Sequence, residues 1–256
     1  KIPIKLWLKE LEPGALQQAK DLANLDIAFR HIAIMPDAHQ GYGMPIGGVM
    51  ATKDAIVPNA VGVDIGCGMC SLRTNYKHVE EHDLKKIMGI IRQTVPVGFK
   101  HHKKAQDESW MPPKDKDLKI VSEEYSSALK QIGTLGGGNH FIEIQKRTDG
   151  YVWIMVHSGS RNIGLKVANY YHKKAVKELA KRKDNNTPKD LSYFMRGTEG
   201  YEDYFNEMNY CIEFALQSRK LMMERIKQAF THVLPDVEFS NFINTPHNFA
   251  AWEKHF

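Results

Sequence analysis

The stretch MPDAHQGYGMPIGGVMATKDAIVPNAVGVDIGCGMC, residues 35–70, determines how the rest of the chain is interpreted. It is dense in glycine, which permits positive φ and a close approach of the backbone to a ligand. Asp37, His39, Asp64 and Cys67 lie among these glycines and suggest a rigid, polar binding site for a small charged group. Ordinary surface loops also use glycine, proline and aspartate, for turn geometry alone.

The second half of this stretch predicts a strand. Residues 61–68, VGVDIGCG, are apolar and β-branched between their glycines, and residues 61–73 together are predicted to form a buried strand. An aspartate and a cysteine on such a strand are better explained as ligands than as turn residues. We therefore expect Asp64 and Cys67 to belong to a binding site.

The whole chain is typical of an α+β protein. A hydrophobic fraction of 42% in 256 residues supports a substantial core, and we find no repeats and no composition break, so residues 1–256 are interpreted as one domain. Strands are expected at 4–8, 31–35, 47–52, 55–58, 61–73, 141–144, 151–156 and 237–243. Helices are expected at 13–24, 80–94, 122–129, 163–183 and 201–230, with Ser122 near the start of the third.

Composition also limits location and partners. No run of eighteen apolar residues is present, so no transmembrane helix or membrane association is expected, and three cysteines do not make a disulfide framework. We expect a cytoplasmic, reducing location. The net charge of +5 permits polyanion binding, and the basic stretches at 99–104 and 172–183 are candidates for it or plain solvated surface. His101 and His102 are interpreted as surface residues.

Three further clusters place strong ligands beside small residues at strand ends. They are GGGNHFIE at 136–143, HSGSR at 157–161 and TPHN at 245–248. A single histidine is more often a hydrogen-bonded residue than a ligand, but strand ends meet at one edge of a sheet. The oxygen, sulfur and nitrogen donors that would then converge are Asp64, Cys67, His140, His157 and His247. A thiolate able to bridge two ions would permit a binuclear site, and these donor types favour zinc.

Other motifs are weaker. Cys67 and Cys70 form a C-x-x-C, but a zinc ribbon needs a second pair and Cys211 stands alone, so Cys70 and Cys211 are interpreted as buried thiols. No phosphate-binding P-loop motif is present. Residues 136–139 could donate backbone N–H groups to a phosphate and Arg161 a guanidinium, or the triple glycine is a plain turn.

The stretch at 35–70 and three later motifs carry a family resemblance. Residues 35–48 match MPDxHxGxGxxIGG, residues 61–68 match VGxDIxCG, and NHxxE, H-[ST]-G-S-R and HN segments follow. The chain resembles the RtcB family of RNA ligases over nearly its whole length. The resemblance implies a single α+β domain with central mixed and antiparallel sheets flanked by helices, and a metal site at the strand ends.

The resemblance also implies residue roles. It assigns two Mn²⁺ ions, in place of zinc, to Asp64, Cys67, His140, His157 and His247. It gives Arg161 a phosphate contact, counts Cys67 among the catalytic residues, and makes Asp37 the residue that orients a histidine attacking GTP. Binding of GTP or GMP falls to Asn139, His140, Glu143 and Arg161, with Asn248 beside the last ligand.

The implied activity is GTP- and Mn²⁺-dependent joining of RNA 3′-phosphate or 2′,3′-cyclic phosphate ends to 5′-hydroxyl ends through a histidine–GMP intermediate. The partners would be GTP and RNA, either tRNA halves or broken RNA, and accessory proteins and oligomeric state stay open. Two alternatives are kept: a metal-dependent cyclic-phosphate hydrolase, and a non-catalytic, metal-stabilised RNA-binding module.

The nucleophilic histidine of the family belongs to an H-G-A-G-R segment downstream of the HN motif. Here nine residues follow His247, and His255, with no glycine near it, is the remaining histidine. We therefore expect the nucleophile segment to be missing from this chain and the domain to be incomplete at its C-terminus. A fragment of a longer ligase is favoured over a truncated relative.

Overall fold

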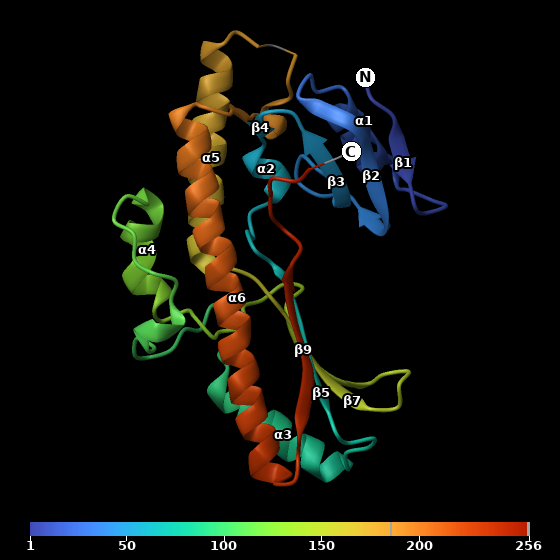
Figure 1. The fold of residues 1–256 in the computed structure, drawn as a ribbon, viewed down its shortest axis with the longest axis vertical. Coiled ribbons are helices and arrows are strands. Elements are labelled where there is room, and N and C mark those ends of the chain that lie inside the picture. Colours follow the sequence, from blue (N-terminus) through green and yellow to red (C-terminus); the bar gives the residue numbers. More distant parts are fainter. Residues whose placement is uncertain (185, 255–256) are drawn as a thin grey trace. The chain divides into compact units, whose positions relative to one another are not determined.

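The structure is a computed structural model that describes residues 1–184 and 186–254. Its mixture of separate helices and sheets, drawn in Figure 1, confirms the predicted α+β class. The chain divides into two compact units. Unit 1 comprises Lys1–Val63, Val167–Asn206 and the residues from Ala250, and unit 2 comprises Asp64–Lys166 and Glu207–Phe249. The long helices α5 (Arg161–Lys181) and α6 (Glu199–Val233) contribute residues to both.

Unit 1 is built on a mixed three-stranded sheet. Strand β2 (Ala28–His39) pairs in parallel with β1 (Ile4–Leu6) and antiparallel with β3 (Ile46–Thr52). Helix α1 (Pro13–Ala23) begins at a proline, whose missing N–H is not needed there, and buries its alanine and leucine side chains against this sheet. The remaining elements are β4 (Ala55–Ile56), α2 (Pro58–Val61), η2 (Lys189–Leu191) and β8 (Phe194–Met195), with β4 and β8 paired.

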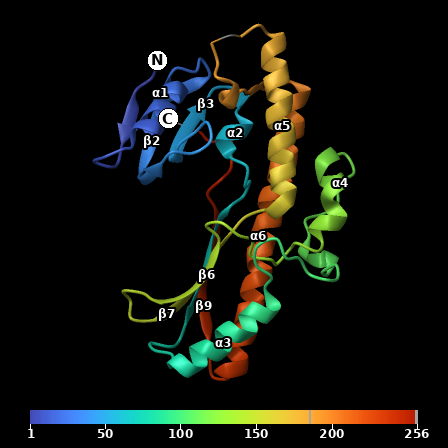
Figure 2. The same ribbon diagram turned by 180° about the vertical axis from the view of Figure 1, so that it is seen from behind.

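Unit 2 contains a four-stranded antiparallel sheet in the order β6-β7-β5-β9. The strands are β5 (Gly68–Thr74), β6 (Phe141–Lys146), β7 (Val152–Ser158) and β9 (Phe239–Pro246). The hairpin of β6 and β7 and helix α3 (Glu81–Thr94) are seen from behind in Figure 2. Apolar residues of the sheet, of α3 and of the second half of α6 form the core, among them Leu72, Ile87, Ile154, Met222 and Phe230.

The predicted strand at 61–73 is wrong in its first half. Pro58–Val61 forms the short helix α2, and β5 begins only at Gly68. The backbone between them cannot be extended, because Gly62 has φ +93° and Gly66 has φ +74°, and strands require negative φ. Asp64 and Cys67 therefore lie on an irregular segment that leads into the strand.

Helix α4 (Lys119–Ala128) begins before the predicted Ser122. Its N-terminus is completed by the buried carboxylate of Glu207, which accepts hydrogen bonds from the backbone N–H groups of Ile120 and Val121, both at 3.0 Å. A carboxylate at this position satisfies free N–H groups and complements the helix dipole. The loop before α4 contains the short helix η1 (Glu108–Trp110).

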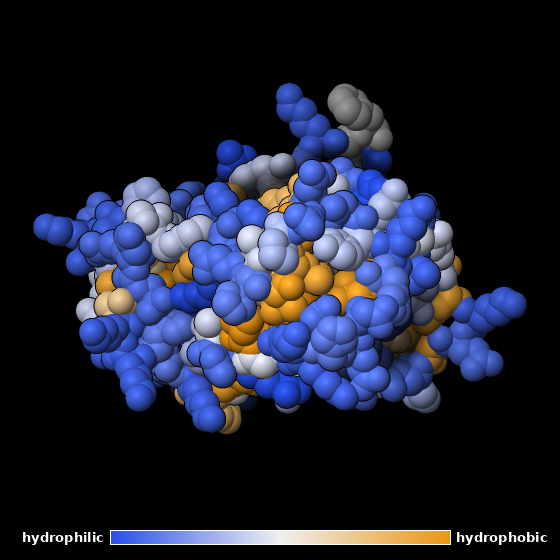
Figure 3. Space-filling view, turned by 90° about the horizontal axis from the view of Figure 1, so that it is seen from below, coloured by the Kyte–Doolittle hydropathy of each residue, from blue (hydrophilic) through white to orange (hydrophobic). Residues whose placement is uncertain are grey.

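Some apolar surface is not buried. Figure 3 shows a region of hydrophobic residues between hydrophilic ones on the face drawn there. The exposed large apolar side chains of unit 2 include Phe99 in the loop after α3 and Phe242 and Ile243 on β9. None of the helices in the described part of the chain is long and apolar enough to cross a membrane.

Candidate metal centre

The strand register of unit 2 brings the candidate ligands to one edge of the sheet. Gly68 of β5 pairs with Ser158 of β7 and with Pro246 of β9, and Phe141 of β6 pairs with His157. In an antiparallel sheet the start of one strand lies beside the end of the next. The residues just outside or at these strand ends, Cys67, His140, His157 and His247, are therefore neighbours.

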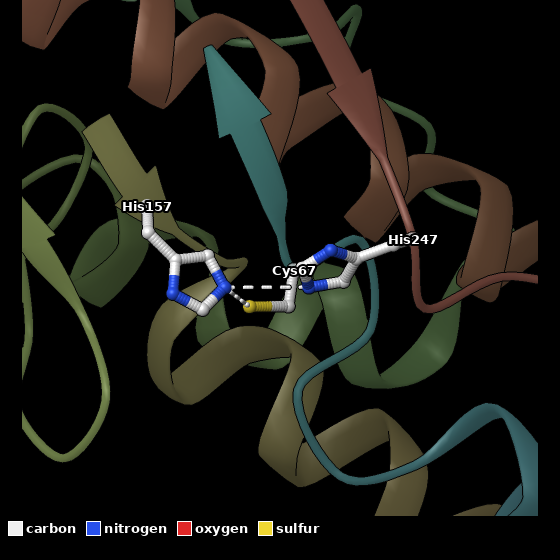
Figure 4. Close-up of side chains that lie close together, drawn as sticks. All are labelled: Cys67, His157 and His247. Atoms are coloured by element: carbon white, nitrogen blue, oxygen red, sulfur yellow. Dashed lines mark hydrogen bonds between the residues drawn. The ribbon is translucent and has the colours of Figure 1, made fainter. Parts of the chain in front are cut away.

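Their donor atoms converge. Sγ of Cys67 lies 3.2 Å from Nε2 of His157 and 3.5 Å from Nε2 of His140. The two Nε2 atoms of His157 and His247 are 3.3 Å apart, and Figure 4 shows both rings directed at the sulfur. Oδ2 of Asp64 lies 2.8 Å from Nε2 of His140. All five residues predicted as ligands thus form one cluster.

The cluster separates into two overlapping ligand groups. Cys67, His157 and His247 form one, and Asp64, Cys67 and His140 the other, with the donor atoms of each within 4.8 Å of one another. Cys67 belongs to both groups. The arrangement can hold a metal ion, and its shared sulfur has the layout of a bridging ligand.

Two of the histidines are oriented by their Nδ1 atoms, so that Nε2 faces the other donors of the cluster. Nδ1 of His140 is 2.9 Å from the carbonyl oxygen of Leu135, and Nδ1 of His157 is 3.0 Å from that of Asn139. A carbonyl oxygen only accepts, so each Nδ1 carries a proton. Nε2 of His157 then presents its lone pair, and Nε2 of His140, which faces Oδ2 of Asp64 at 2.8 Å, would do so with a cation between the two. This is the arrangement typical of metal-bound histidines, in which a second hydrogen bond fixes the tautomer and the ring.

The chemistry of Cys67 and Asp64 fits a cation. Burial, and then the charge of Asp64, raise the pKa of the Cys67 thiol, so the protonated form is favoured in the protein alone. A bound cation reverses this preference by stabilising the thiolate. The carboxylate of Asp64 occupies space that only glycine leaves open, because a Cβ on Gly159 would lie 2.2 Å from both of its oxygens.

Arg219 is a buried residue of this region that the sequence analysis missed. It lies on α6, its side chain is fully buried, and Nη1 donates to the carbonyl oxygens of Gly66 and Ser158 at 2.8 and 2.7 Å. Its Nε donates to Oδ1 of Asn244 on β9 at 2.8 Å. The guanidinium thus joins three segments: the one before β5, which carries Cys67, the end of β7, which carries His157, and β9, which leads directly to His247.

The pKa of Arg219 reflects both its burial and the charged groups around it. Burial lowers its pKa, while the nearby Cys70, Cys67 and Asp64 act in the opposite direction. Its Nη2 is buried and has no hydrogen-bond partner in the described part of the chain. An arginine within the apolar stripe of α6, between Leu216 and Met222, was the sequence feature that could have revealed it.

Arg161 is held close to the cluster by hydrogen bonds to the Thr134 hydroxyl and to a backbone carbonyl. It starts α5 with φ +61°, a conformation that costs a non-glycine residue about 1–3 kcal/mol. Its Nε donates to Oγ1 of Thr134 at 3.1 Å and its Nη2 to the carbonyl oxygen of Gly98 at 2.9 Å. Any Cβ on Gly136 would collide with its guanidinium. Nη1 is the group of Arg161 left for a ligand among the described contacts.

The other predicted site residues are placed differently. Asn139 and Glu143 are exposed, Asn139 directly before the cluster residue His140 and Glu143 three residues after it on β6. Asn248 holds the ligand segment, since Nδ2 donates to the carbonyl oxygen of Asp64 at 3.2 Å. Asp37 is exposed on β2 of unit 1, whereas the cluster belongs to unit 2.

Cys70 and Cys211 are fully buried free thiols outside the ligand groups, as predicted. His255, which the sequence analysis also considered, lies outside the residues that the structure describes.

These features define a class of protein: an α+β protein with a cluster of oxygen, sulfur and nitrogen donors at one edge of an antiparallel sheet. Comparison with known proteins identifies the family within this class. The family described as tRNA-splicing ligase RtcB matches residues 18–256. The chain is 37% identical to the RNA-splicing ligase RtcB of Escherichia coli K12, over 99% of this chain and 68% of the relative. It is 29% identical to the tRNA-splicing ligase RtcB of Thermococcus kodakarensis, over 96% of this chain and 62% of that protein. The chain belongs to the RtcB family of RNA ligases, and the predicted family and enzyme class are confirmed.

Proposed function

We propose that this chain provides the metal centre of a GTP- and Mn²⁺-dependent RNA ligase. The ligase joins RNA that ends in a 3′-phosphate or 2′,3′-cyclic phosphate to RNA that begins with a 5′-hydroxyl. GMP is carried on a histidine, as the family resemblance implies. The observation that supports this most directly is the convergence of Asp64, Cys67, His140, His157 and His247, since all five come from the motifs that define the family.

The proposed ligand set is those five residues, with Cys67 shared between two ions. Bound divalent cations supply charge neutralisation for phosphoryl oxygens. The chain itself contributes the fixed directions of the donors, because His140 and His157 are oriented by backbone carbonyls. Donor softness alone favours zinc, and the family resemblance favours manganese, so the metal present in the native protein is part of the test.

The proposed nucleotide contacts lie around the cluster. Arg161 directs its free Nη1 to a phosphate, and the exposed side chains of Asn139 and Glu143 bind the guanine nucleotide. Asn248 acts through the segment that it holds at Asp64. Asp37 orients the guanylylated histidine.

The test is ligation by the full-length natural protein. Two labelled RNAs, one with a 3′-phosphate and one with a 5′-hydroxyl, are incubated with Mn²⁺ and GTP, and the joined product is measured on a denaturing gel. We expect a product that requires both cofactors, and a protein mass increased by one GMP. Cys67→Ala should abolish the product, whereas Cys211→Ala, a matched change of a buried thiol outside the cluster, should retain it.

The alternatives give different results in the same assay. A cyclic-phosphate hydrolase would open a 2′,3′-cyclic phosphate without GTP and form no joined product. A non-catalytic RNA-binding module would bind RNA with neither GTP binding nor turnover. Either result would replace the ligase proposal.

A further inference from the structure

Phe99 is an exposed aromatic residue with no evident structural purpose. It follows α3 by five residues, and its relative exposure of 101% is the highest among the large apolar side chains of the described residues. A phenylalanine in this state contributes nothing to the core and loses the free energy that burial would give. A single exposed apolar residue is ordinary by itself, so what matters is how Phe99 is held and what surrounds it.

The backbone around Phe99 is nevertheless fixed. Gly98 donates its N–H to the carbonyl oxygen of Gly136 at 2.7 Å and accepts from Nη2 of Arg161 at 2.9 Å. Lys100 donates its backbone N–H to the carbonyl oxygen of Val97 at 3.3 Å. The Phe99 ring is therefore exposed to solvent on a turn whose backbone is fixed by hydrogen bonds.

The far side of the loop is fixed too. His102, predicted to be a surface residue, is half-buried: its N–H donates to the carbonyl oxygen of Lys130 at 2.9 Å, and its Nε2 accepts from Nη1 of Arg225 at 2.9 Å. Burial, and then the charge of Arg225, lower the pKa of His102. His102 is thus a neutral anchor of the loop.

The same backbone connects Phe99 to the metal centre. Leu135 donates its N–H to the carbonyl oxygen of Pro96 at 2.9 Å and accepts from Nδ1 of His140 through its own carbonyl oxygen. Residues 135–136 thus hold both the loop that presents Phe99 and the ring of a proposed metal ligand. The position of Phe99 relative to His140 is set by two short hydrogen-bonded segments.

The first part of the loop, residues 96–106, is also basic. Lys100, Lys103 and Lys104 are exposed and form no ion pair with any described residue. No acidic residue occurs between Pro96 and Gln106. The basic stretch at 172–183 is partly neutralised, by pairs such as Lys174 with Asp203 at 3.0 Å, although its exposed Lys173 and Lys177 likewise form no ion pair with a described residue. Both candidate tracks for a polyanion therefore keep unpaired lysines, and the loop is the one that carries them beside the exposed ring of Phe99.

We propose that Phe99 is a stacking platform for an unpaired base near the end of an RNA strand, whose phosphates are bound by Lys100, Lys103 and Lys104. This inference rests on the proposed ligase function and makes it more specific: the bound end is single-stranded and is recognised with little regard to sequence. An exposed aromatic face beside a positive track is the usual means of binding single strands, since every base offers a face for stacking. A base inside a duplex does not offer that face.

The test measures RNA binding separately from ligation. Fluorescence anisotropy with the full-length protein, Mn²⁺ and no GTP gives the affinity for a labelled single-stranded RNA with a 3′-phosphate and for a blunt duplex of the same sequence. Phe99→Ala should weaken binding of the single strand about 5- to 150-fold, the equivalent of one lost base–aromatic stack, and leave duplex binding unchanged. Phe99→Trp should retain the affinity, and Phe99→Leu, which keeps apolar bulk but no ring face, should behave like Phe99→Ala.

Metal content and thermal midpoint of each variant are measured alongside, and both should equal those of the wild type because the side chain makes no packing contact. Equal single-strand affinity of Phe99→Ala and wild type overturns this inference while leaving a ligating wild type intact. Full retention by Phe99→Leu, or an equal loss with duplex, also overturns stacking. A wild type that binds no RNA defeats the proposed function and this inference together.

Discussion

Nη1 of Arg219 donates to the carbonyl oxygen of Gly66, the residue before Cys67, at a distance of 2.8 Å. The same nitrogen donates to Ser158, the residue after His157. A single buried cation therefore sets the separation of the backbone segments that present two of the proposed ligands. Because the cluster lies at the ends of strands, where the sheet hydrogen bonds stop, its geometry depends on contacts of this kind.

Replacement of Arg219 should disturb both folding and metal binding. Arg219→Met leaves three acceptors, two of them buried, without a donor and should lower the free energy of unfolding by about 3 kcal/mol or more. Arg219→Lys keeps the charge but cannot reach all three acceptors and should be intermediate. Denaturant unfolding gives the stability, and the sulfur–cobalt charge-transfer band of the Co²⁺-loaded protein reports the Cys67 contact. An unchanged band in Arg219→Lys would show that the arginine does not position the ligand.

Metal stoichiometry should separate the two ligand groups. Asp64→Asn removes a donor from one group and His247→Ala from the other, so each should reduce the bound metal from two ions to one. Cys67→Ala removes the donor that both share and should abolish binding of both. Equilibrium dialysis with elemental analysis measures the number of ions, with Cys211→Ala as the control that keeps two. Retention of one full equivalent by Cys67→Ala would contradict a shared sulfur.

The space that the Asp64 carboxylate occupies beside Gly159 can be tested by adding a single methyl group. Gly159→Ala places a Cβ where the carboxylate oxygens lie and should displace Asp64, with loss of one metal ion. Gly89→Ala is the matched control: Gly89 lies in α3 with no atom within 4 Å of the added carbon, so this variant should keep both ions and gain up to about 1 kcal/mol of stability. Equal metal content of the two variants would remove Gly159 from the site.

The basic loop should determine the salt dependence of RNA binding. Replacing Lys100, Lys103 and Lys104 by alanine should reduce the slope of log affinity against log salt by about 2 for single-stranded RNA, since each phosphate contact contributes about 0.7. A triple alanine variant of Lys85, Lys86 and Arg92 on α3 removes the same charge from the same unit. Similar slopes for the two variants would mean that the loop acts through net charge alone.

The ligands could be predicted from the sequence because each lies in a short motif with glycine or small residues around it, and because strand ends meet at a sheet edge. The backbone conformation of the segment that carries Asp64 and Cys67 could not be predicted from the sequence. Residues 61–67 alternate like a strand, and only the positive φ at Gly62 and Gly66, imposed by tertiary packing, shows that they are not one.

The supporting residues were hidden for another physical reason. Arg219 stands beside Lys220 in a long helix, and neighbouring cations in a helix normally face water, so its burial depends on partners from three distant segments. Glu207 caps α4 from 87 positions away along the chain. Local patterns identify groups that bind a ligand, whereas the groups that hold them in place are defined by contacts made after folding.

The tautomers of His140 and His157 have an electrostatic consequence. With their Nδ1 protons held by carbonyl oxygens, both rings coordinate as neutral ligands, and within the two ligand groups only Asp64 and the thiolate of Cys67 bring negative charge. Two divalent cations bring twice that charge, so a loaded centre keeps an excess of about two positive charges, with the guanidinium of Arg219 beside it. In the proposed ligase this excess positive charge would be balanced from outside the protein, by the phosphates of a nucleotide and of an RNA end.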